Sequence, residues 1–311
     1  MGSREANSGK RFALENILPP PSTGQWHRCA KTGLVSYRPA PGEVDIAGFV
    51  PVAALHSNVL SLVGVRNVSI RGLALLYGSD ANDRNAPSAE QPAILNVSGG
   101  SQHVDIAGCE ISCGSGAGVG VNGGAAYVRV RSSWLHGLGG SGVSIGPTQA
   151  DEQNTRPQPS GPQPNQTGWF PHDVTVENCV VAHVGGVFLT QPAGVRIADA
   201  NRVAVRGCDI GFSTYAGIVA RLKATFNGHT FERNHVHDYG GLLSDLGGVY
   251  ISGSCQQHNA LCPEANTSID SNIIRRSTFF AHGGNGIYVD GGPSSLSAWI
   301  AVCPPCSCER P

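Results

Sequence analysis

Two aspartates, Asp245 and Asp290, are the residues of this chain with the clearest chemical potential. Asp245 precedes the run Leu246-Gly247-Gly248-Val249-Tyr250, and Asp290 follows the run Gly286-Ile287-Tyr288-Val289. Each acid is close to glycines, which allow a bound molecule to approach the backbone. Two carboxyl groups that face one substrate can act as general acid and as base or nucleophile. For either acid alone, a simple turn explains an aspartate beside Gly-Gly at least as well, so the prediction of acid-base chemistry depends on the pair.

The composition indicates what kind of fold must position these acids. Of 311 residues, Gly 42 and Pro 20 make up about a fifth, and aromatic residues are only 6%, which is typical of short strands joined by tight turns. The net charge is −1 without a basic cluster, which argues against a nucleic-acid partner. No run of eighteen apolar residues predicts a membrane helix. The first ten residues lack the apolar core of a secretion signal, and the sequence leaves an extracellular location open.

From Asn67 onward the chain repeats itself, with a basic period of 24 to 26 residues into which loops are inserted. The repeats align on apolar anchors, which are Ile70, Ile106, Val130, Val176, Val205, Phe231 and Ile269. Five places later stand the apolar residues Leu75, Ile111, Leu135, Val181, Ile210, Val236 and Ile274. One place after each anchor the residue is polar or small. This alternation with period two predicts strands with one buried and one exposed face.

A second strand is expected in each later repeat, starting at Gly118, Gly142, Gly194, Gly217, Gly248 and Gly286. Units of this size without a helical pattern cannot bury their own apolar faces, so they must stack. We therefore predict an all-β fold, a right-handed parallel β-helix of about seven coils. Residues at matched positions should form ladders, for example Cys109, Ser133, Cys179, Cys208, Asn234 and Asn272. A propeller or sandwich fits less well, because these folds need longer antiparallel strands and hairpin signals.

Three regions are predicted along the chain. Residues 1–44 form an N-terminal segment, in which Lys31-Thr32-Gly33 between two short apolar runs predicts a hairpin turn. Residues 45–296 form the β-helix, and residues 297–311 form an irregular, cysteine-rich tail that is consistent with a truncated or misjoined chain. Two long insertions, Gly146 to Pro171 and Ser252 to Ala265, are expected to project from the solenoid and to wall a cleft.

The cysteines favour structural roles over metal binding. Three of them recur at one repeat position, where a small buried side chain suffices; they are Cys109, Cys179 and Cys208. Cys255 and Cys262 bracket a loop and could pair with each other. The C-x2-C-x-C tail that begins at Cys303 has no second ligand cluster to complete a tetrahedral zinc site. We expect no metal and no other cofactor.

Four stretches carry a resemblance to a known family. They are the segment Trp26 to Pro39 and the motifs Asn234-His235-Val236-His237-Asp238, Leu243-Ser244-Asp245-Leu246-Gly247-Gly248-Val249-Tyr250 and Gly286-Ile287-Tyr288-Val289-Asp290. They resemble the β-helix enzymes of glycoside hydrolase family 141, whose members are α-L-fucosidases and xylanases that act on plant polysaccharides. The resemblance covers roughly residues 11–296. It implies that Asp245 and Asp290 match the catalytic pair proposed for that family, one as general acid and one as nucleophile or base.

Six further residues are candidates for binding an oligo- or polysaccharide substrate, namely His237, Asp238, Tyr250, His282, Tyr288 and Arg221. The histidine and aspartate that precede the first acid could hydrogen-bond sugar hydroxyls, although a histidine satisfied within its own turn explains the same pattern. Aromatic faces stack on sugar rings, and ordinary packing is the alternative. Arg221 occupies the place in its repeat that Asp290 occupies two repeats later, where it would meet a substrate carboxylate or solvent.

Two other functions remain open from the sequence. Many parallel β-helices are polysaccharide lyases, whose chemistry usually needs a Ca²⁺ site of clustered acids and a basic residue. Asp270, Asp245 and Arg221 are available for this, but no compact acidic cluster is present in the sequence. A non-catalytic solenoid could hold glycans in the same groove. In each case the expected partner is a polysaccharide, with neither nucleic acid nor membrane.

Overall fold

The computed structural model describes residues 22–29, 31–43, 52–79, 92–147, 170–187, 192–222, 228–243, 245–253, 267–277, 284–290 and 296–299. The chain divides into two compact units, Met1–Val52 and Ala53–Pro311. In the first unit, β1 (Trp26–Arg28) pairs antiparallel with β2 (Val35–Tyr37). The turn between them includes Gly33, whose φ of 72° lies in the left-handed region that glycine tolerates. The predicted hairpin is confirmed.

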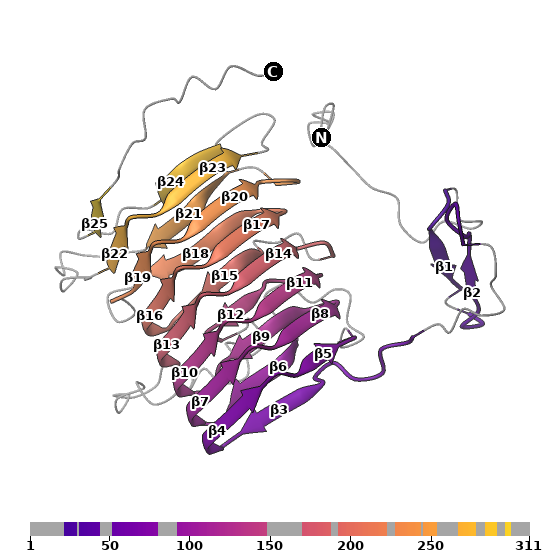
Figure 1. Cartoon of the computed structure of the whole chain (residues 1–311), viewed down its shortest axis with the longest axis horizontal. Helices are drawn as coiled ribbons and strands as arrows, with labels where there is room; N and C mark the ends of the chain where they lie inside the picture. Colours follow the sequence, from indigo (N-terminus) through magenta and orange to yellow (C-terminus); the bar gives the residue numbers. More distant parts are fainter. Residues whose placement is uncertain are drawn as a thin grey trace, which may run out of the picture. The chain divides into compact units, whose positions relative to one another are not determined.

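The second unit is a right-handed parallel β-helix, as predicted (Figure 1). Its described strands form three parallel sheets, and successive coils add one strand to each sheet. Parallel pairing of this kind lets every coil cover the apolar side chains of the coil before it, which a single coil could not do alone. None of the described elements is a helix able to cross a membrane.

The strands of each sheet follow one another in chain order. Sheet I consists of β4 (Arg66–Arg71), β7 (Gln102–Ala107), β10 (Ala126–Arg131), β13 (His172–Glu177), β16 (Asn201–Arg206), β19 (Thr230–Glu232), β22 (Thr267–Asp270) and β25 (Leu296–Trp299). Sheet II consists of β5 (Ala74–Leu76), β8 (Glu110–Gly114), β11 (Trp134–Leu138), β14 (Val180–Val184), β17 (Asp209–Ser213), β20 (His235–Tyr239) and β23 (Ile273–Ser277). Sheet III consists of β3 (Leu60–Val63), β6 (Ala93–Ser98), β9 (Ala117–Val121), β12 (Val143–Ile145), β15 (Ala193–Ile197), β18 (Ala216–Leu222), β21 (Leu246–Gly253) and β24 (Gly284–Asp290).

The predicted register of the repeats is confirmed. In sheet I the anchors face one another from coil to coil, with Val130 opposite Ile106 and Phe231 opposite Val205. Most anchors are fully buried and form a continuous core with the apolar residues of sheets II and III. The side chains one place later lie on the outer face of sheet I, where Arg131 and Asp105 form an ion pair across coils at 2.8 Å. The period-two alternation therefore determines which side chains are available to a ligand.

The bend between sheets I and II contains the predicted ladder. The cysteines of this position are buried, and two of their backbone N–H groups donate to side chains of the next coil, Cys109 to Oγ of Ser133 at 3.1 Å and Cys208 to Oδ1 of Asn234 at 3.0 Å. Asn234 in turn donates to the carbonyl oxygen of Val205 and to Oδ1 of Asn272, both at 2.9 Å. These bonds satisfy backbone groups that the turn removes from the sheets.

Sheet I continues further than predicted. β25 pairs with β22, with Ala298 opposite Ile269, so the regular coil extends to Trp299 and does not end at residue 296. The boundary between the two units also falls after Val52, not after residue 44. Most of the first insertion, the second insertion from residue 254 on with Cys255 and Cys262, and the tail from residue 300 on lie outside the described residues.

Candidate active site

The last coils of sheet III present Asp290 on their outer face. Asp290 on β24 lies opposite Ser252 on β21, which lies opposite Arg221 on β18. The predicted positional match between Arg221 and Asp290 is thus confirmed. Two residues earlier, Tyr288 lies opposite Tyr250. Because residues two apart on a strand share a face, the acid, the arginine and the two tyrosines lie on one exposed side of the sheet.

Asp245 reaches the same face from the turn before β21. Leu246 and Gly247 both belong to β21, and Asp245 itself makes the turn before this strand with a φ of 59°. An aspartate adopts this left-handed conformation more easily than most residues. The hydroxyl of Tyr215 donates to the backbone carbonyl oxygen of Asp245 at 2.8 Å and so holds the turn. The Asp245 residue is exposed.

A pair of stacked tyrosines links the two acids. Tyr250 donates from its hydroxyl to Oδ2 of Asp290 at 2.7 Å, and a side-chain hydrogen bond joins Tyr288 to the Asp245 carboxylate. The rings of Tyr250 and Tyr288 are stacked, with centroids 5.0 Å apart and an interplanar angle of 21°. Each tyrosine therefore bonds to the acid of the neighbouring coil, and both carboxylates meet one aromatic pair.

The tyrosines act here as hydrogen-bond donors, not as bases. Burial, followed by the negative charge of Asp245, raises the pKa of Tyr215 to about 12. Burial and the hydrogen bond to Asp290 raise the pKa of Tyr250, and the hydrogen bond to Asp245 raises the pKa of Tyr288. Tyr215 packs edge-to-face against Tyr250, with centroids 6.0 Å apart. All three hydroxyls therefore keep their protons at neutral pH.

The other predicted binding residues divide between two sheets. Tyr250, Tyr288 and Arg221 accompany the acids on sheet III, whereas His237 and Asp238 lie on β20 of sheet II. His282 lies outside the described residues. Hydrogen bonds from Arg276 and His237 hold the pKa of Asp238 well below its usual range. We considered from the sequence that His237 is satisfied within its own turn. Its 2.7 Å contact with the neighbouring Asp238 fits this interpretation but is one of its two contacts with carboxylates.

The second contact of His237 belongs to a group of possible metal ligands. Nε2 of His237 lies 2.7 Å from Oδ1 of Asp209 on β17. Among the described residues, Asp209, His235 and His237 can each offer a ligand atom within 4.8 Å of the others. The group arises because β17 and β20 are neighbours, with Asp209 opposite His235.

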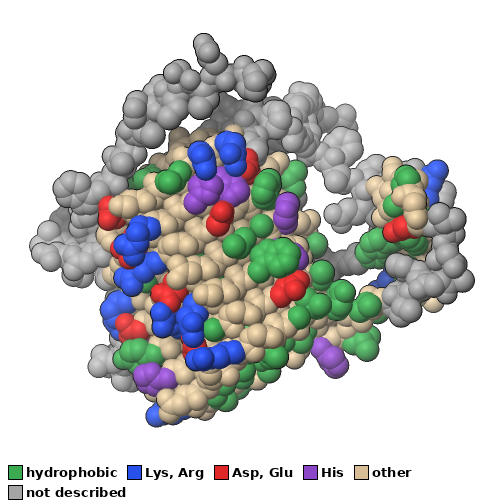
Figure 2. Space-filling view, in the orientation of Figure 1, with side chains coloured by type: hydrophobic (Ala, Val, Ile, Leu, Met, Phe, Trp, Pro, Cys, Tyr) green, Lys and Arg blue, Asp and Glu red, His purple; other side chains and the backbone are tan. Residues whose placement is uncertain are grey.

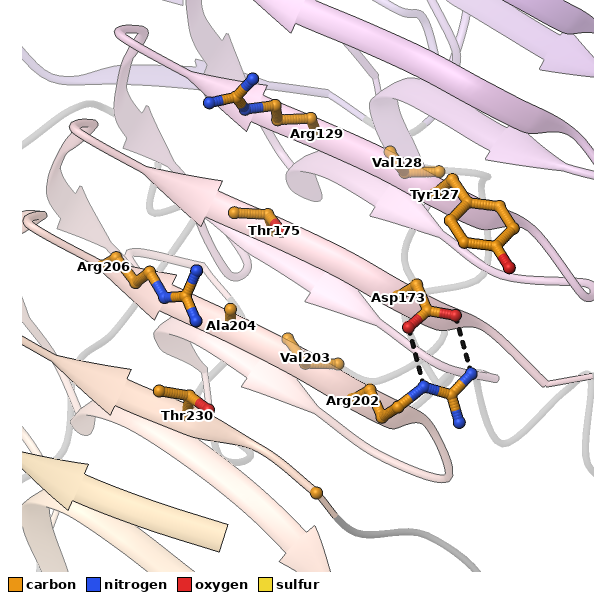
Figure 3. Close-up of a pocket in the computed structure, with 11 residues that line it drawn as sticks. Tyr127, Val128, Arg129, Asp173, Thr175, Arg202, Val203, Ala204, Arg206 and Thr230 are labelled. Carbon is orange, nitrogen blue, oxygen red and sulfur yellow. Dashed lines mark hydrogen bonds and ion pairs between the residues drawn. The ribbon is translucent and has the colours of Figure 1, made fainter. Parts of the chain in front are cut away.

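A separate groove lies on the outer face of sheet I (Figure 3). It has a volume of about 490 Å³, and Thr175, Ala204 and Thr230 from successive coils lie along it. Its charged side chains take part in three ion pairs, which are Arg202 with Asp173, Arg129 with Glu177 and Arg206 with Glu232. The groove contains neither Asp245 nor Asp290, and its arginines already face carboxylates, so we do not assign the chemistry to it.

Comparisons with known proteins agree with this fold. Residues 165–298 match the family described as "Right handed beta helix region". A solved structure named "Glycoside hydrolase" superposes with a TM-score of 0.67 at 13% identity, over 90% of this chain and 56% of that chain. An alginate lyase from Paenibacillus sp. str. FPU-7 (TM-score 0.39, 13% identity, 74% of this chain and 99% of that chain) is also similar. So is the A-module of the mannuronan C-5 epimerase AlgE6 from Azotobacter vinelandii (TM-score 0.37, 14% identity, 78% of this chain and 59% of that chain).

These likenesses concern the fold. The chain is a right-handed parallel β-helix protein, and it spans little more than half the length of the glycoside hydrolase that it resembles. No curated protein sequence matches it.

Two residues of these sites were missed by sequence reasoning. Asp209 follows its anchor Val205 by four places, as His235 follows Phe231, so the repeat register contained the signal for their juxtaposition. Tyr215 had no comparable signal. Tyr215 lies in the connection before β18, which is two residues long, whereas Asp245 lies in the connection before β21, which is six residues long. Because the lengths differ, the repeat does not align these two residues.

Proposed function

We propose that this chain is a carbohydrate-active β-helix protein, a glycoside hydrolase that cleaves α-L-fucoside or xylan linkages of plant-type polysaccharides with Asp245 and Asp290. The observation that carries the proposal is that both carboxylates bind the same tyrosine pair on one exposed face of sheet III. The structural likeness to a glycoside hydrolase supports the scaffold, and the motif resemblance to family 141 supports the choice of linkages.

The chemistry needs two carboxyl groups with different tasks. One, protonated, gives its proton to the leaving oxygen of the scissile bond, and the other, ionised, attacks the anomeric carbon or activates water. Asp290 accepts a hydrogen bond from the buried hydroxyl of Tyr250, whereas Asp245 is exposed on a turn. The two carboxylates therefore have different surroundings, and the proposal assigns one of the two tasks to each.

The protonated tyrosines favour hydrolysis over a lyase reaction. A lyase needs a base that removes a proton from a sugar carbon. The raised pKa of Tyr215 and Tyr250 makes these hydroxyls poor bases at neutral pH. Asp270, which we had considered for a lyase site with Asp245, lies on β22 of sheet I, a different sheet from β21. Within the described residues, the arrangement on sheet III therefore fits acid catalysis best.

The test is to replace Asp245 and Asp290 singly by Asn and to assay aryl α-L-fucosides and xylan. Loss of an acid or base of this kind costs about 10²- to 10⁴-fold in rate. Asp270→Asn is the matched control, because it makes the same chemical change on sheet I. Undiminished turnover in one variant removes that residue from the mechanism. The configuration of the first sugar product, followed by NMR, separates retention from inversion.

Two outcomes would replace the proposal. An unsaturated sugar product from the wild-type chain would assign it to the lyases. Saturable glycan binding without turnover of any tested linkage, unchanged in Asp245→Asn, would describe a binding solenoid.

A further inference from the structure

The outer face of sheet II carries a cluster of histidines with basic and acidic side chains around it (Figure 2). His235 and His237 are two residues apart on β20 and share a face, and their rings lie 4.5 Å apart. Asp209 on β17 approaches both, with Oδ1 at 2.7 Å from Nε2 of His237 and Oδ2 at 3.6 Å from Nδ1 of His235. The cluster lies on a different sheet from the acid pair and is independent of the proposed function.

His237 lies between two carboxylates, and this position needs a cation. Nδ1 is 2.7 Å from Oδ2 of Asp238, and Nε2 is 2.7 Å from Oδ1 of Asp209. A neutral imidazole has only one N–H, so one of these contacts would set a nitrogen lone pair against a carboxylate oxygen. A metal ion bound between the ring and Asp209 would remove this repulsion.

The surroundings orient His237 for binding such an ion. Arg276 donates to both carboxylate oxygens of Asp238, at 2.9 and 2.7 Å, and so fixes them beside Nδ1 of His237 as acceptors for its N–H. That leaves the lone pair of Nε2 directed at Asp209. A histidine that donates its other N–H to a carboxylate is the usual arrangement around a protein-bound metal.

We propose that Asp209, His235 and His237 bind a divalent transition-metal ion such as Zn²⁺. Two imidazoles and one carboxylate are suitable ligands, and three protein ligands leave a fourth position for water. Ligand atoms around a tetrahedral zinc ion lie about 3.3 Å apart, given Zn–N distances of about 2.0 Å. The two printed separations, 2.7 and 3.6 Å, bracket that value. The bound ion would link strand β17 to strand β20 of the next coil.

Arg275 competes with metal binding at His235, and this competition can be tested. Its Nε donates to Nε2 of His235 at 2.8 Å, so in the neutral ring the proton is on Nδ1. Binding of a metal through Nδ1 moves this proton to Nε2 and breaks the bond from Arg275. Removal of the Arg275 donor should therefore tighten metal binding.

The structure supplies a matched control three coils earlier in sheet II. His136 Nε2 lies 3.1 Å from Oε1 of Glu110, and the ring stacks on Trp134, which occupies the place that His235 has in the cluster. This site has one histidine and one carboxylate but lacks the second histidine. It should not bind the ion with comparable affinity.

The experiment is calorimetric titration of the full chain with Zn²⁺, after alkylation of its cysteines. We expect one ion per chain, at least tenfold weaker binding in Asp209→Asn and in His237→Gln, and unchanged binding in His136→Gln. Arg275→Met should bind at least threefold more tightly. Titration with Co²⁺, followed by its ligand-field absorption bands, should rank the variants in the same order of affinity. Wild-type affinity in both Asp209→Asn and His237→Gln, or no binding by the wild type at millimolar Zn²⁺, would overturn the proposal. Weaker binding in Arg275→Met would refute the proton argument, and this variant keeps all three ligands if another variant fails to fold.

Discussion

The buried histidine His229 makes the stability of the β-helix sensitive to mild acid. It precedes β19 and is fully buried, with its ring stacked on Phe231 at 6.1 Å. Nδ1 accepts a hydrogen bond from the Val203 N–H at 3.2 Å, so Nε2 carries the proton of the neutral ring. Nε2 has no hydrogen-bond partner among the described residues. A second proton would place a charge in the interior at the cost of its hydration.

Burial lowers the pKa of His229 from 6.5 to about 4. Between these two values the unfolded chain binds more protons than the folded chain, so the free energy of unfolding falls as the pH decreases. The contribution is complete above pH 6.5 and is lost progressively as the pH falls toward 4. At ~1.4 kcal/mol per pH unit, this interval corresponds to ~3 kcal/mol of stability.

The assay is urea unfolding of the wild-type chain and of His229→Asn at several pH values from 7 to 4. Asn Oδ1 can accept the Val203 N–H in place of Nδ1 but does not titrate, so the variant should lose ~3 kcal/mol less over this range. The depressed pKa of Asp173, about 2, affects stability only at lower pH and does not interfere. Parallel curves for the two proteins, differing by less than ~1 kcal/mol in their pH response, would refute the assignment of a buried neutral His229.

Three further predictions address the corner, the core and the turn. Asn234→Ala removes the ladder bonds at the corner between sheets I and II and should lower the free energy of unfolding by about 2–3 kcal/mol in denaturant titrations. Gly217→Ala places a Cβ 2.3 Å from a methyl group of Val236, which lies across the core on β20 of sheet II, and should cost about 1–3 kcal/mol. Gly286→Ala at the matching position has nothing within 4 Å and should be close to neutral, so equal losses would contradict the packing. Tyr215→Phe removes the bond to the Asp245 carbonyl oxygen and, if the proposed function is correct, should lower kcat/KM by up to about tenfold, with Tm changed little.

Repetition made the fold predictable from sequence. Each anchor and its apolar partner five places later recur in seven coils, and a one-residue slip would expose every one of them. Such a pattern specifies strand pairing and register, and with them the core and the match of Arg221 with Asp290. The same reasoning predicted the asparagine ladder, because a position-matched residue can only meet its copies above and below.

What the repeat does not cover depended on tertiary structure. Asp245 lies in the connection before β21, which is longer than the one before β18, and Asp245 itself takes the left-handed conformation there. The tyrosine pair that joins the acids, with Tyr215 behind it, depends on side-chain directions across two coils. The sequence by itself determined the solenoid and which face of each strand is exposed, since burial of apolar side chains has a period that can be counted. Only the three-dimensional structure decided which exposed side chains meet, because turns and long side chains follow local sterics that differ from one coil to the next.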